Sequence, residues 1–355
     1  MISPLLRKSS LFVGAALALA TAANAQVIAC DNFSYPDGSL VLQSGVWVNH
    51  SGTADDLLVS GGQVVVQHGT PSEDANLSFT PIAGDIYFGI DFSVRDQGVP
   101  ISGTDNEYFA HFKDTGNNFA GRLDVVSPTG TGDFSVGIAS DESTADAIWA
   151  TDLTYGVTYR AIVRYDQDAN IAELWIDAAA STGTSILGED RADPGDVISA
   201  FALRQSDSDF NESVLVDNLI VGATFDSVLN VDASATLRNG GTNPASYTVS
   251  GGPVMGNTFQ AMIDVGSTGH SFGQLIGFGG PLTFTLGTGQ TLLIDITDPG
   301  GELLGLPASA GPIAGYTIAV PVNCALLGFS LSTQAVHIGG APFLLSNAQD
   351  LVIGN

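Results

Sequence analysis

The amino-acid sequence predicts an all-β protein made of two antiparallel sandwich domains. Apolar and polar residues alternate in short runs such as 86–94, as expected for strands with one buried face. Clusters of Gly, Asp, Asn, Ser and Thr separate these runs and supply turns. The chain has 355 residues, enough for two domains, and no Lys or Arg follows Arg238. This change of composition predicts two domains, 26–229 and 230–355.

The first 25 residues have the features of an export signal. Arg7 and Lys8 precede the apolar run 11–20, and Ala23 and Ala25 supply small residues at the positions that a signal peptidase reads. The apolar run is too short to span a bilayer as a helix of the mature protein. We therefore expect cleavage after Ala25 and a secreted or cell-surface location.

The two cysteines, Cys30 and Cys324, allow one disulfide in an oxidising compartment. Such a bridge would join the start of the first domain to the second, but sequence does not establish that the Cα atoms come within bonding reach. An alternative takes residues 27–30 as a lipid-attachment motif with Cys30 lipidated. The polar stretch 21–26, which separates that motif from the apolar run, argues against lipidation. Two cysteines so far apart make no metal motif.

The formal net charge of −27 bears on the partners. Binding to nucleic acid or to an anionic membrane needs clustered Lys and Arg, which the chain lacks. No second apolar segment reaches spanning length. We therefore expect no nucleic-acid partner and no membrane span. A glycan or a cell-surface component remains as the expected partner.

The stretch 157–177 predicts a β-hairpin closed by a polar turn. With residues 166–169 as the loop, Val163 lies opposite Ala172 on the core face. The other face then sets Arg160 against Trp175, where a guanidinium over an indole adds a cation–π contact. A shift of one residue would mix the two faces.

Further strands are expected throughout the first domain. The same alternation, interrupted by turn residues, predicts strands at 86–94, 108–113, 119–126, 134–139, 197–205 and 214–221. In this phase the core-facing side chains include Phe88, Phe112, Leu123 and Val136.

Three segments of the first domain together resemble a known family. They read DNFSYPDGSL at 31–40, LTYGVTYRAIVRYDQDANIAELWID at 153–177, and VLVDNLIVGATFDSVL at 214–229. Their order is similar to the concanavalin A-like (laminin G-type) jelly roll of secreted bacterial proteins. The resemblance implies a two-sheet antiparallel sandwich whose first and last strands lie side by side. Members are often carbohydrate- or surface-binding modules and some relatives are glycoside hydrolases, so no single function follows from the fold.

The second domain reads as a smaller, glycine-rich β-sandwich. Its expected strands are 259–265, 282–286, 291–296, 316–320, 325–331, 333–338 and 351–353. The arrangement is similar to a C-terminal module that recurs in secreted bacterial proteins. We expect this module to serve attachment, assembly or spacing.

Outward-facing polar residues of the first domain offer a candidate binding surface. Strand phase places Asp91, His111 and Arg122 opposite the core positions, so they would line a concave sugar-binding face. Trp47, Trp149 or Trp175 would supply a stacking platform. The alternative is a solvated sheet face, with the tryptophans in the core.

A loop before the last strand of this domain is rich in oxygen ligands. Asp207, Asp209, Asn211 and Glu212 predict a site for Ca²⁺, which prefers carboxylate and amide oxygens. The loop 166–170 also alternates such ligands, but it lacks the glycine and distal glutamate of an EF-hand and is typical of a hairpin turn.

No catalytic set is expected. Glu173 and Asp177 superficially resemble the acidic strand of laminarinase-type glycosidases, whose retaining members hold two carboxyl groups about 5–5.5 Å apart. Trp175 occupies the position of the central carboxylate, which removes the core of that mechanism. The preferred interpretation is an exported, non-enzymatic module that binds carbohydrate or another extracellular surface. The alternatives are a glycoside hydrolase or lyase of the same fold, and a purely structural surface protein.

Overall fold

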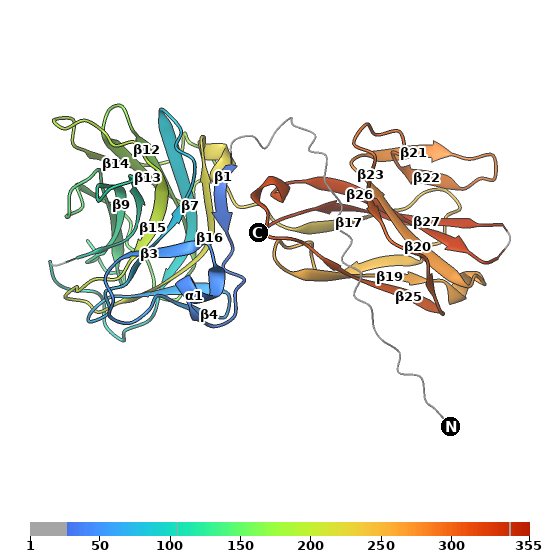
Figure 1. Cartoon of the computed structure of the whole chain (residues 1–355), viewed down its shortest axis with the longest axis horizontal. Helices are drawn as coiled ribbons and strands as arrows, with labels where there is room; N and C mark the ends of the chain where they lie inside the picture. Colours follow the sequence, from blue (N-terminus) through green and yellow to red (C-terminus); the bar gives the residue numbers. More distant parts are fainter. Residues whose placement is uncertain (1–26, 105, 341) are drawn as a thin grey trace, which may run out of the picture.

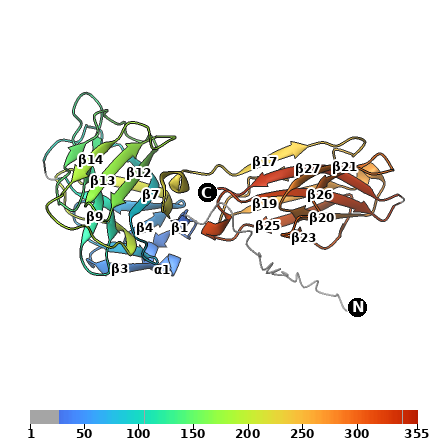
Figure 2. The same cartoon turned by 90° about the horizontal axis from the view of Figure 1, so that it is seen from above.

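The computed structural model describes residues 27–355 except 105 and 341, so the predicted signal segment lies outside the described residues. It confirms an all-β antiparallel fold with a jelly-roll sandwich and a second, smaller sandwich. The two sandwiches lie side by side along the long axis (Figures 1 and 2), with β1 (Val27–Asp31) facing the second one. No helix among the described residues is long and apolar enough to cross a membrane.

A nine-stranded sheet forms one layer of the jelly roll. Its order is β14-β13-β12-β7-β16-β5-β4-β2, and β1 pairs with β16. The first and last strands therefore lie side by side, as the resemblance implied. The strands other than β1 are β2 (Gly38–Ser39), β4 (Leu58–Ser60), β5 (Gln63–Gln67), β7 (Asp85–Val94), β12 (Tyr159–Asp166), β13 (Ile171–Ile176), β14 (Ile186–Glu189) and β16 (Ser213–Gly222).

A seven-stranded sheet forms the opposite layer, in the order β11-β10-β9-β8-β15-β6-β3. A short helix, α1 (Leu40–Ser44), precedes its edge strand β3. Ser39 caps this helix by accepting from the Leu42 N–H, and Gly45 ends it with a left-handed backbone. The strands are β3 (Trp47–Ser51), β6 (Asp74–Ser78), β8 (Tyr108–Lys113), β9 (Phe119–Val126), β10 (Ser135–Ala139), β11 (Ala147–Ile148) and β15 (Ala200–Arg204).

The core between the two sheets is aromatic. The ring of Phe88 from the nine-stranded sheet meets Phe112 and Phe201 of the seven-stranded sheet edge to face, with both centroid distances 5.0 Å. The core-facing residues expected from strand phase, including Leu123 and Val136, are fully buried. The alternation of strand residues thus located this core correctly.

The hairpin β12–β13 has a different register from the predicted one. Val163 pairs with Leu174, and Ile162 pairs with Trp175, so the predicted pairings of Val163 with Ala172 and Arg160 with Trp175 are wrong. The shift is two residues, which leaves each side chain on its predicted face. It arises because Asp166 is still paired and the turn begins only at Gln167.

The second sandwich combines a six-stranded sheet (β17-β27-β26-β20-β23, with β24 beside β20), a three-stranded sheet (β18-β19-β25) and the pair β21–β22. One expected strand, 325–331, is wrong: its first part is a 3-10 turn, Cys324–Leu326, begun by the Asn323 cap. The strands are β17 (Ser234–Arg238), β18 (Tyr247–Ser250), β19 (Thr258–Asp264), β20 (Phe272–Phe278), β21 (Pro281–Thr285), β22 (Thr291–Ile294), β23 (Glu302–Gly305), β24 (Ser309–Ala310), β25 (Ile313–Ala319), β26 (Ser330–Ile338) and β27 (Leu344–Val352).

A buried apolar junction joins the two sandwiches. On the outer face of the nine-stranded sheet, the side chains of Ile162, Trp175 and Ile220 pack in one cluster with residues of the second sandwich, such as Met255 and Leu351. The 3-10 turn Phe225–Val228, drawn beside β1 in Figure 1, contributes both of its apolar residues. The outer face of this sheet is therefore partly an interior surface.

A disulfide closes the same junction. Cys30 of β1 is bonded to Cys324 of the second sandwich, with Cα atoms 5.6 Å apart and a sequence separation of 294. Cys30 is thus not available for lipidation in this structure. The bridge that the sequence allowed is present, and it fastens the first strand of the jelly roll to the second sandwich.

Candidate functional site

The four predicted sugar-binding residues divide between two sheets. His111 of β8 and Arg122 of β9 lie together on the outer face of the seven-stranded sheet. Asp91 of β7 and Trp175 of β13 lie on the outer face of the nine-stranded sheet. The structure therefore brings together two of the four residues, and the single surface expected from the sequence is wrong.

Trp175 is part of the junction between the sandwiches. Its side chain is 3% exposed, and its ring meets Phe225 edge to face with centroids 5.2 Å apart. Trp47 and Trp149 are buried as well, in the jelly-roll core. The role of Trp175 as a stacking platform is therefore wrong, because the indole is covered by protein. The alternative expectation, that the tryptophans are buried in the protein interior, is confirmed.

Asp91 is a structural anchor beside the same junction. Its carboxylate pairs with Arg160 at 3.2 Å and accepts from the side-chain amides of Asn218 and Asn230. Arg160 also donates to the carbonyl of Val228, which places the whole group where the chain leaves the jelly roll. These contacts satisfy Asp91 internally and remove it from the candidate binding surface.

The outer face of the seven-stranded sheet carries a group of charged, aromatic and buried titratable side chains. Three of its central strands are neighbours in the order β9-β8-β15, and β6 and β3 follow. This arrangement brings together residues that are distant in sequence. We call this surface the polar face; its residues are His50, Asp74, Tyr108, His111, Phe119, Arg122, Asp124 and Arg204.

Two guanidinium groups lie over one tyrosine at the centre of the polar face. The Arg122 and Arg204 guanidinium carbons are 4.8 and 4.4 Å from the ring centroid of Tyr108. Arg204 forms ion pairs with Glu107 and, at 4.0 Å, with Asp74. Arg122 is different, because no carboxylate pairs with it among the residues that the structure describes.

The orientation of Arg122 is fixed by groups that leave its charge uncompensated. Its Nε donates to the carbonyl of Phe119 at 3.2 Å, and its guanidinium carbon lies 5.8 Å from the Phe119 ring centroid. Within the described residues its terminal nitrogens have no hydrogen-bond partner. Those nitrogens form the planar fork that matches a carboxylate or sulfate.

His111 lies beneath this layer as a neutral base. Its side chain is fully buried, and burial holds the pKa of the imidazole well below its ordinary value. Nδ1 lies 2.9 Å from the carbonyl of Phe112, which only accepts, so Nδ1 carries the proton. Nε2 then keeps a lone pair, and it has no partner among the described residues.

Asp124 is the second buried titratable group of the polar face. It is 0% exposed, and burial raises the pKa of its carboxyl well above the ordinary range, which favours the protonated form. One oxygen accepts from Asn106 at 3.2 Å, whereas the other has no described partner. The polar face thus holds two buried titratable groups, Asp124 and His111, whose charged forms are both disfavoured by burial.

Three side chains linked by hydrogen bonds lie at the edge of the polar face. Ser51 donates to Asp74 at 2.6 Å, and its oxygen lies 3.3 Å from Nδ1 of His50. Burial raises the pKa of Asp74 to about 6 and lowers that of His50 to about 4. At pH 7 the Ser51 proton therefore points at the Asp74 carboxylate, and Nδ1 of neutral His50 donates to Ser51.

The predicted calcium loop does not assemble one ligand set. Glu212 is buried, accepts from Ser208 at 2.6 Å and lies beside His68, whereas Asp207 and Asp209 are exposed. Asn211 adopts a left-handed backbone with φ of 50°. A calcium ion held by Asp207, Asp209, Asn211 and Glu212 stays a prediction without support from this geometry.

A different acidic group does come together. Oxygen atoms of Asp141, Asp190 and Asp193 lie within 4.8 Å of one another, the one such triple among the described His, Cys, Asp and Glu residues. Asn170, in the predicted hairpin turn, donates to Asp141 at 3.1 Å. Two of these residues follow strands far apart in sequence, so spacing could not reveal the group.

The residues that superficially resembled a glycosidase strand are engaged structurally. Glu173 pairs with Arg164 at 3.3 Å and accepts from Ser185 at 2.7 Å. Asp177 accepts from the backbone N–H of Arg160 at 2.7 Å. Their roles are those of a scaffold at the end of the hairpin.

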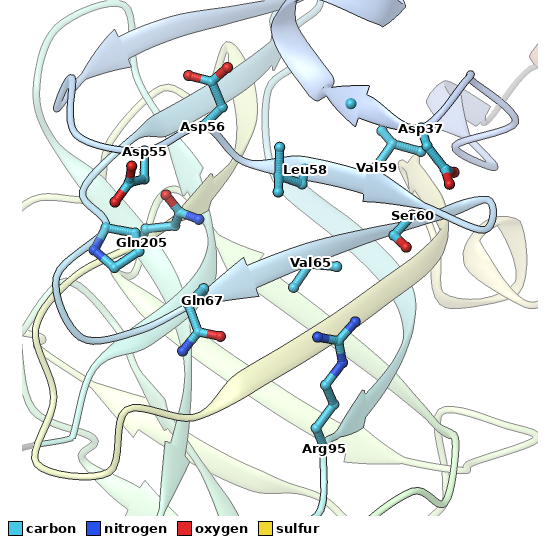
Figure 3. Close-up of a pocket in the computed structure, with 12 residues that line it drawn as sticks. Asp37, Asp55, Asp56, Leu58, Val59, Ser60, Val65, Gln67, Arg95 and Gln205 are labelled. Carbon is cyan, nitrogen blue, oxygen red and sulfur yellow. The ribbon is translucent and has the colours of Figure 1, made fainter.

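A hollow of about 870 Å³ lies apart from the polar face, over β4 and β5 of the nine-stranded sheet. Figure 3 shows Leu58 and Val65 across its middle, Asp55 and Asp56 with Gln205 at one end, and Arg95 beside Val65. The hollow and the perturbed titratable groups of the polar face are therefore in different places. We assign the functional site to the polar face, because buried titratable groups with perturbed pKa values gather there.

No family model matches the chain, and no curated protein matches it. Among solved structures it is similar to a Lotus tetragonolobus seed lectin, with 13% identity over 54% of this chain and 97% of that one, and a TM-score of 0.35. A peanut lectin matches with 12% identity over 56% and 97% of the two chains, and a TM-score of 0.36. A sialidase matches with 12% identity and a TM-score of 0.36 over 56% of this chain, but the match spans only 19% of the sialidase. At these values the likenesses carry no argument about function.

Proposed function

We propose that this protein is a carbohydrate-binding module, and that it holds acidic sugars at the polar face of its jelly roll. The observation that carries the proposal is the Arg122 guanidinium, which is oriented by Tyr108 and Phe119 and has no carboxylate partner among the described residues. A sugar carboxylate or sulfate completes this fork with two parallel hydrogen bonds.

Charge supports an acidic ligand at this face. The formal charge of the whole chain is −27, and the chain has only ten Lys and Arg residues. At the polar face Arg204 is paired with both Asp74 and Glu107, whereas Arg122 has no carboxylate partner among the described residues. The Arg122 guanidinium is therefore open to an anionic ligand at short range.

The location of the polar face also supports recognition of an extended glycan. It lies on the sheet layer opposite the one whose outer face contributes Trp175 and Ile220 to the junction with the second sandwich. We propose further that the protein works outside the cell, at or near a surface, and that the second sandwich serves attachment or spacing. The Cys30–Cys324 bridge, which suits an oxidising compartment, supports this location.

A glycan array tests the proposal on the full chain. We expect binding to uronate- or sulfate-bearing glycans, and a loss of about tenfold or more in affinity for Arg122→Gln, since a charged bidentate contact disappears. Arg191→Gln is the matched control, because Arg191 is exposed and pairs with Glu189 away from the polar face. Absence of any glycan binding, or equal loss in both variants, would contradict the proposal.

A second candidate is a glycoside hydrolase or lyase that uses the same face. It is favoured by the two groups that can move protons there: Asp74, whose pKa is raised to about 6, and His111, whose Nε2 keeps a free lone pair. Release of sugar from a bound acidic polysaccharide, abolished in Asp74→Asn and in His111→Gln, would establish the enzyme. Binding without release supports the module.

A further inference from the structure

The strand β25 forms an open edge of the second sandwich. It is the last strand in the three-stranded sheet β18-β19-β25, and among the described strands it pairs only with β19. Figure 1 shows it at the margin of this sandwich. The register and the hydrogen bonds at both ends of the strand turn the N–H and C=O groups of its even-numbered residues toward β19. The free edge is therefore made of Ile313, Gly315, Thr317 and Ala319.

This free edge lacks the features that usually protect a sheet edge from pairing, which are charge, short length or a cover. With seven residues, β25 is the longest edge strand of the described sheets. The edge strands β14, β17 and β23 each contain a charged residue, which is Glu189, Arg238 or Glu302. In contrast, residues 303–349 contain no Asp, Glu, Lys or Arg. All four residues of the free edge are exposed, so the edge is available to another strand.

The free edge is complementary to itself in the antiparallel direction. With a twofold axis at Tyr316, Ile313 lies opposite Ala319 of a second copy, and Gly315 lies opposite Thr317. Each of these pairs exchanges two backbone hydrogen bonds, so every residue of the free edge is used. Ile313, which is 52% exposed, is then set against a small side chain. The next residue on the free edge, Pro321, has no N–H, so the pairing ends where the strand ends.

The charge distribution of the chain favours a second copy in this arrangement. Only six of the 37 acidic residues lie in 230–355, so the jelly roll carries most of the net charge of −27. Val320, which follows β25, belongs to the junction with the jelly roll, whereas Ile313 begins the strand at its other end. Antiparallel pairing therefore places the two jelly rolls at opposite ends of the pair. Contact is made between uncharged strands, and the repulsion between the distant jelly rolls is screened by salt.

We propose that the protein forms a twofold dimer in which two β25 strands pair antiparallel. The pairing joins two three-stranded sheets into one continuous sheet across the dimer. A twofold contact uses the same surface on both copies, so the assembly closes at two and does not grow into fibres. The dimer does not depend on what the polar face binds, because β25 belongs to the other sandwich.

Sedimentation velocity and amide hydrogen exchange of the full chain, over a series of concentrations, test the dimer. We expect one monomer–dimer step without larger species. The amides of Gly315 and Thr317 should exchange about tenfold or more slowly where the dimer dominates. Those of Tyr316 and Ile318, which face β19, should stay protected at every concentration and serve as the internal control. A monomer throughout, open-ended growth, or a dimer in which the amides of Gly315 and Thr317 still exchange fast would overturn the proposal.

Two variants of the free edge should weaken the dimer about tenfold or more. Gly315→Lys adds a charge where a new Cβ meets nothing within 4 Å, and Thr317→Pro removes an N–H that points away from β19. Ser234→Lys, on the exposed edge strand β17 of the other sheet, is the matched control and should leave the dimer unchanged. Gly315→Lys decides the outcome if Thr317→Pro does not fold. A dimer that survives Gly315→Lys, or an equal loss in Ser234→Lys, would contradict pairing through β25.

Discussion

The two outer faces of the jelly roll show how the same strand pattern serves opposite purposes. On the nine-stranded sheet the outward residues near the junction include Ile162, Trp175 and Ile220, and they are buried against the second sandwich. On the seven-stranded sheet the outward positions include Arg122 and Arg204, with their charges over Tyr108. One face is an interior surface and the other is the candidate binding surface.

One strand of the covered face breaks the alternation of apolar and polar residues. The segment Ala161–Val163 is apolar at three consecutive positions, and all three side chains are fully buried. A strand that is apolar on both faces is covered on both faces. In β12 the second apolar side chain, Ile162, faces the junction cluster. A continuous apolar run thus indicates a strand that is covered on both faces, whatever covers it.

The largest effect is expected at the covered face. Trp175→Ala should lower the free energy of unfolding by about 3–5 kcal/mol, because it leaves a cavity among buried side chains. Denaturant unfolding measures this change. Ile148→Ala is the control, because Ile148 is 46% exposed and its truncation should cost less than about 0.5 kcal/mol. Equal effects of the two substitutions would mean that the junction is not buried in solution.

Removal of the disulfide should cause the next largest loss of stability. The double variant Cys30→Ser with Cys324→Ser should lose about 2–5 kcal/mol of stability, as expected for a bridge that closes a long loop. A reducing agent should shift the unfolding midpoint of the native protein in the same direction and leave the double variant unaffected. Acidic-glycan binding should persist below the unfolding transition, because the polar face lies on the other sheet. Its loss would mean that the junction supports the polar face.

The fold was more predictable than the site for a physical reason. Strand phase is local, so it assigned Phe88, Leu123 and Val136 to the core and Arg122 to an outer face correctly. Phase does not say which of two sheets a strand joins. Asp91 was therefore grouped with Arg122, although β7 and β9 belong to different layers.

The residues that the sequence did not indicate are those brought together by strand order. Tyr108 and Arg204 meet because β8 and β15 are neighbours, although almost a hundred residues separate the two in the chain. Strand phase was the signal that selected Arg122, because it placed Arg122 opposite the core residue Leu123.

The pH dependence of stability should distinguish the polar face from an ordinary solvated surface. The folded-state pKa of Asp74 is raised from 3.8 to about 6, so the folded protein binds this proton more tightly than the unfolded chain. Stability from this group is present below pH 4 and is lost as pH rises through 6. Asp74→Asn should match the native protein near pH 4 and exceed it by about 1–3 kcal/mol above pH 6.

The Asp74→Asn variant is needed for comparison because two histidines change the stability with pH in the opposite direction. Burial lowers the pKa of His50 and of His68 to about 4, so their contribution to stability rises with pH between 4 and 6.5. In the native protein the opposite effects of Asp74 and the histidines on the pH dependence of stability therefore partly cancel. The difference in stability between the native protein and Asp74→Asn isolates the effect of the Asp74 carboxyl group. A difference that does not depend on pH would show that Asp74 is solvated like a surface carboxylate.

The smallest stability change should accompany a large change in binding. Arg122→Lys keeps the positive charge but removes the planar fork that lies over Tyr108 and Phe119. The lost cation–π and hydrogen-bond contacts should lower stability by only about 0.5–1 kcal/mol, measured by denaturant unfolding. Affinity for an acidic glycan should still fall about five- to tenfold, because an ammonium cannot form two parallel bonds to one carboxylate. If lysine restores full affinity, charge alone holds the ligand, and the geometry that sets the polar face apart from the covered face is irrelevant to recognition.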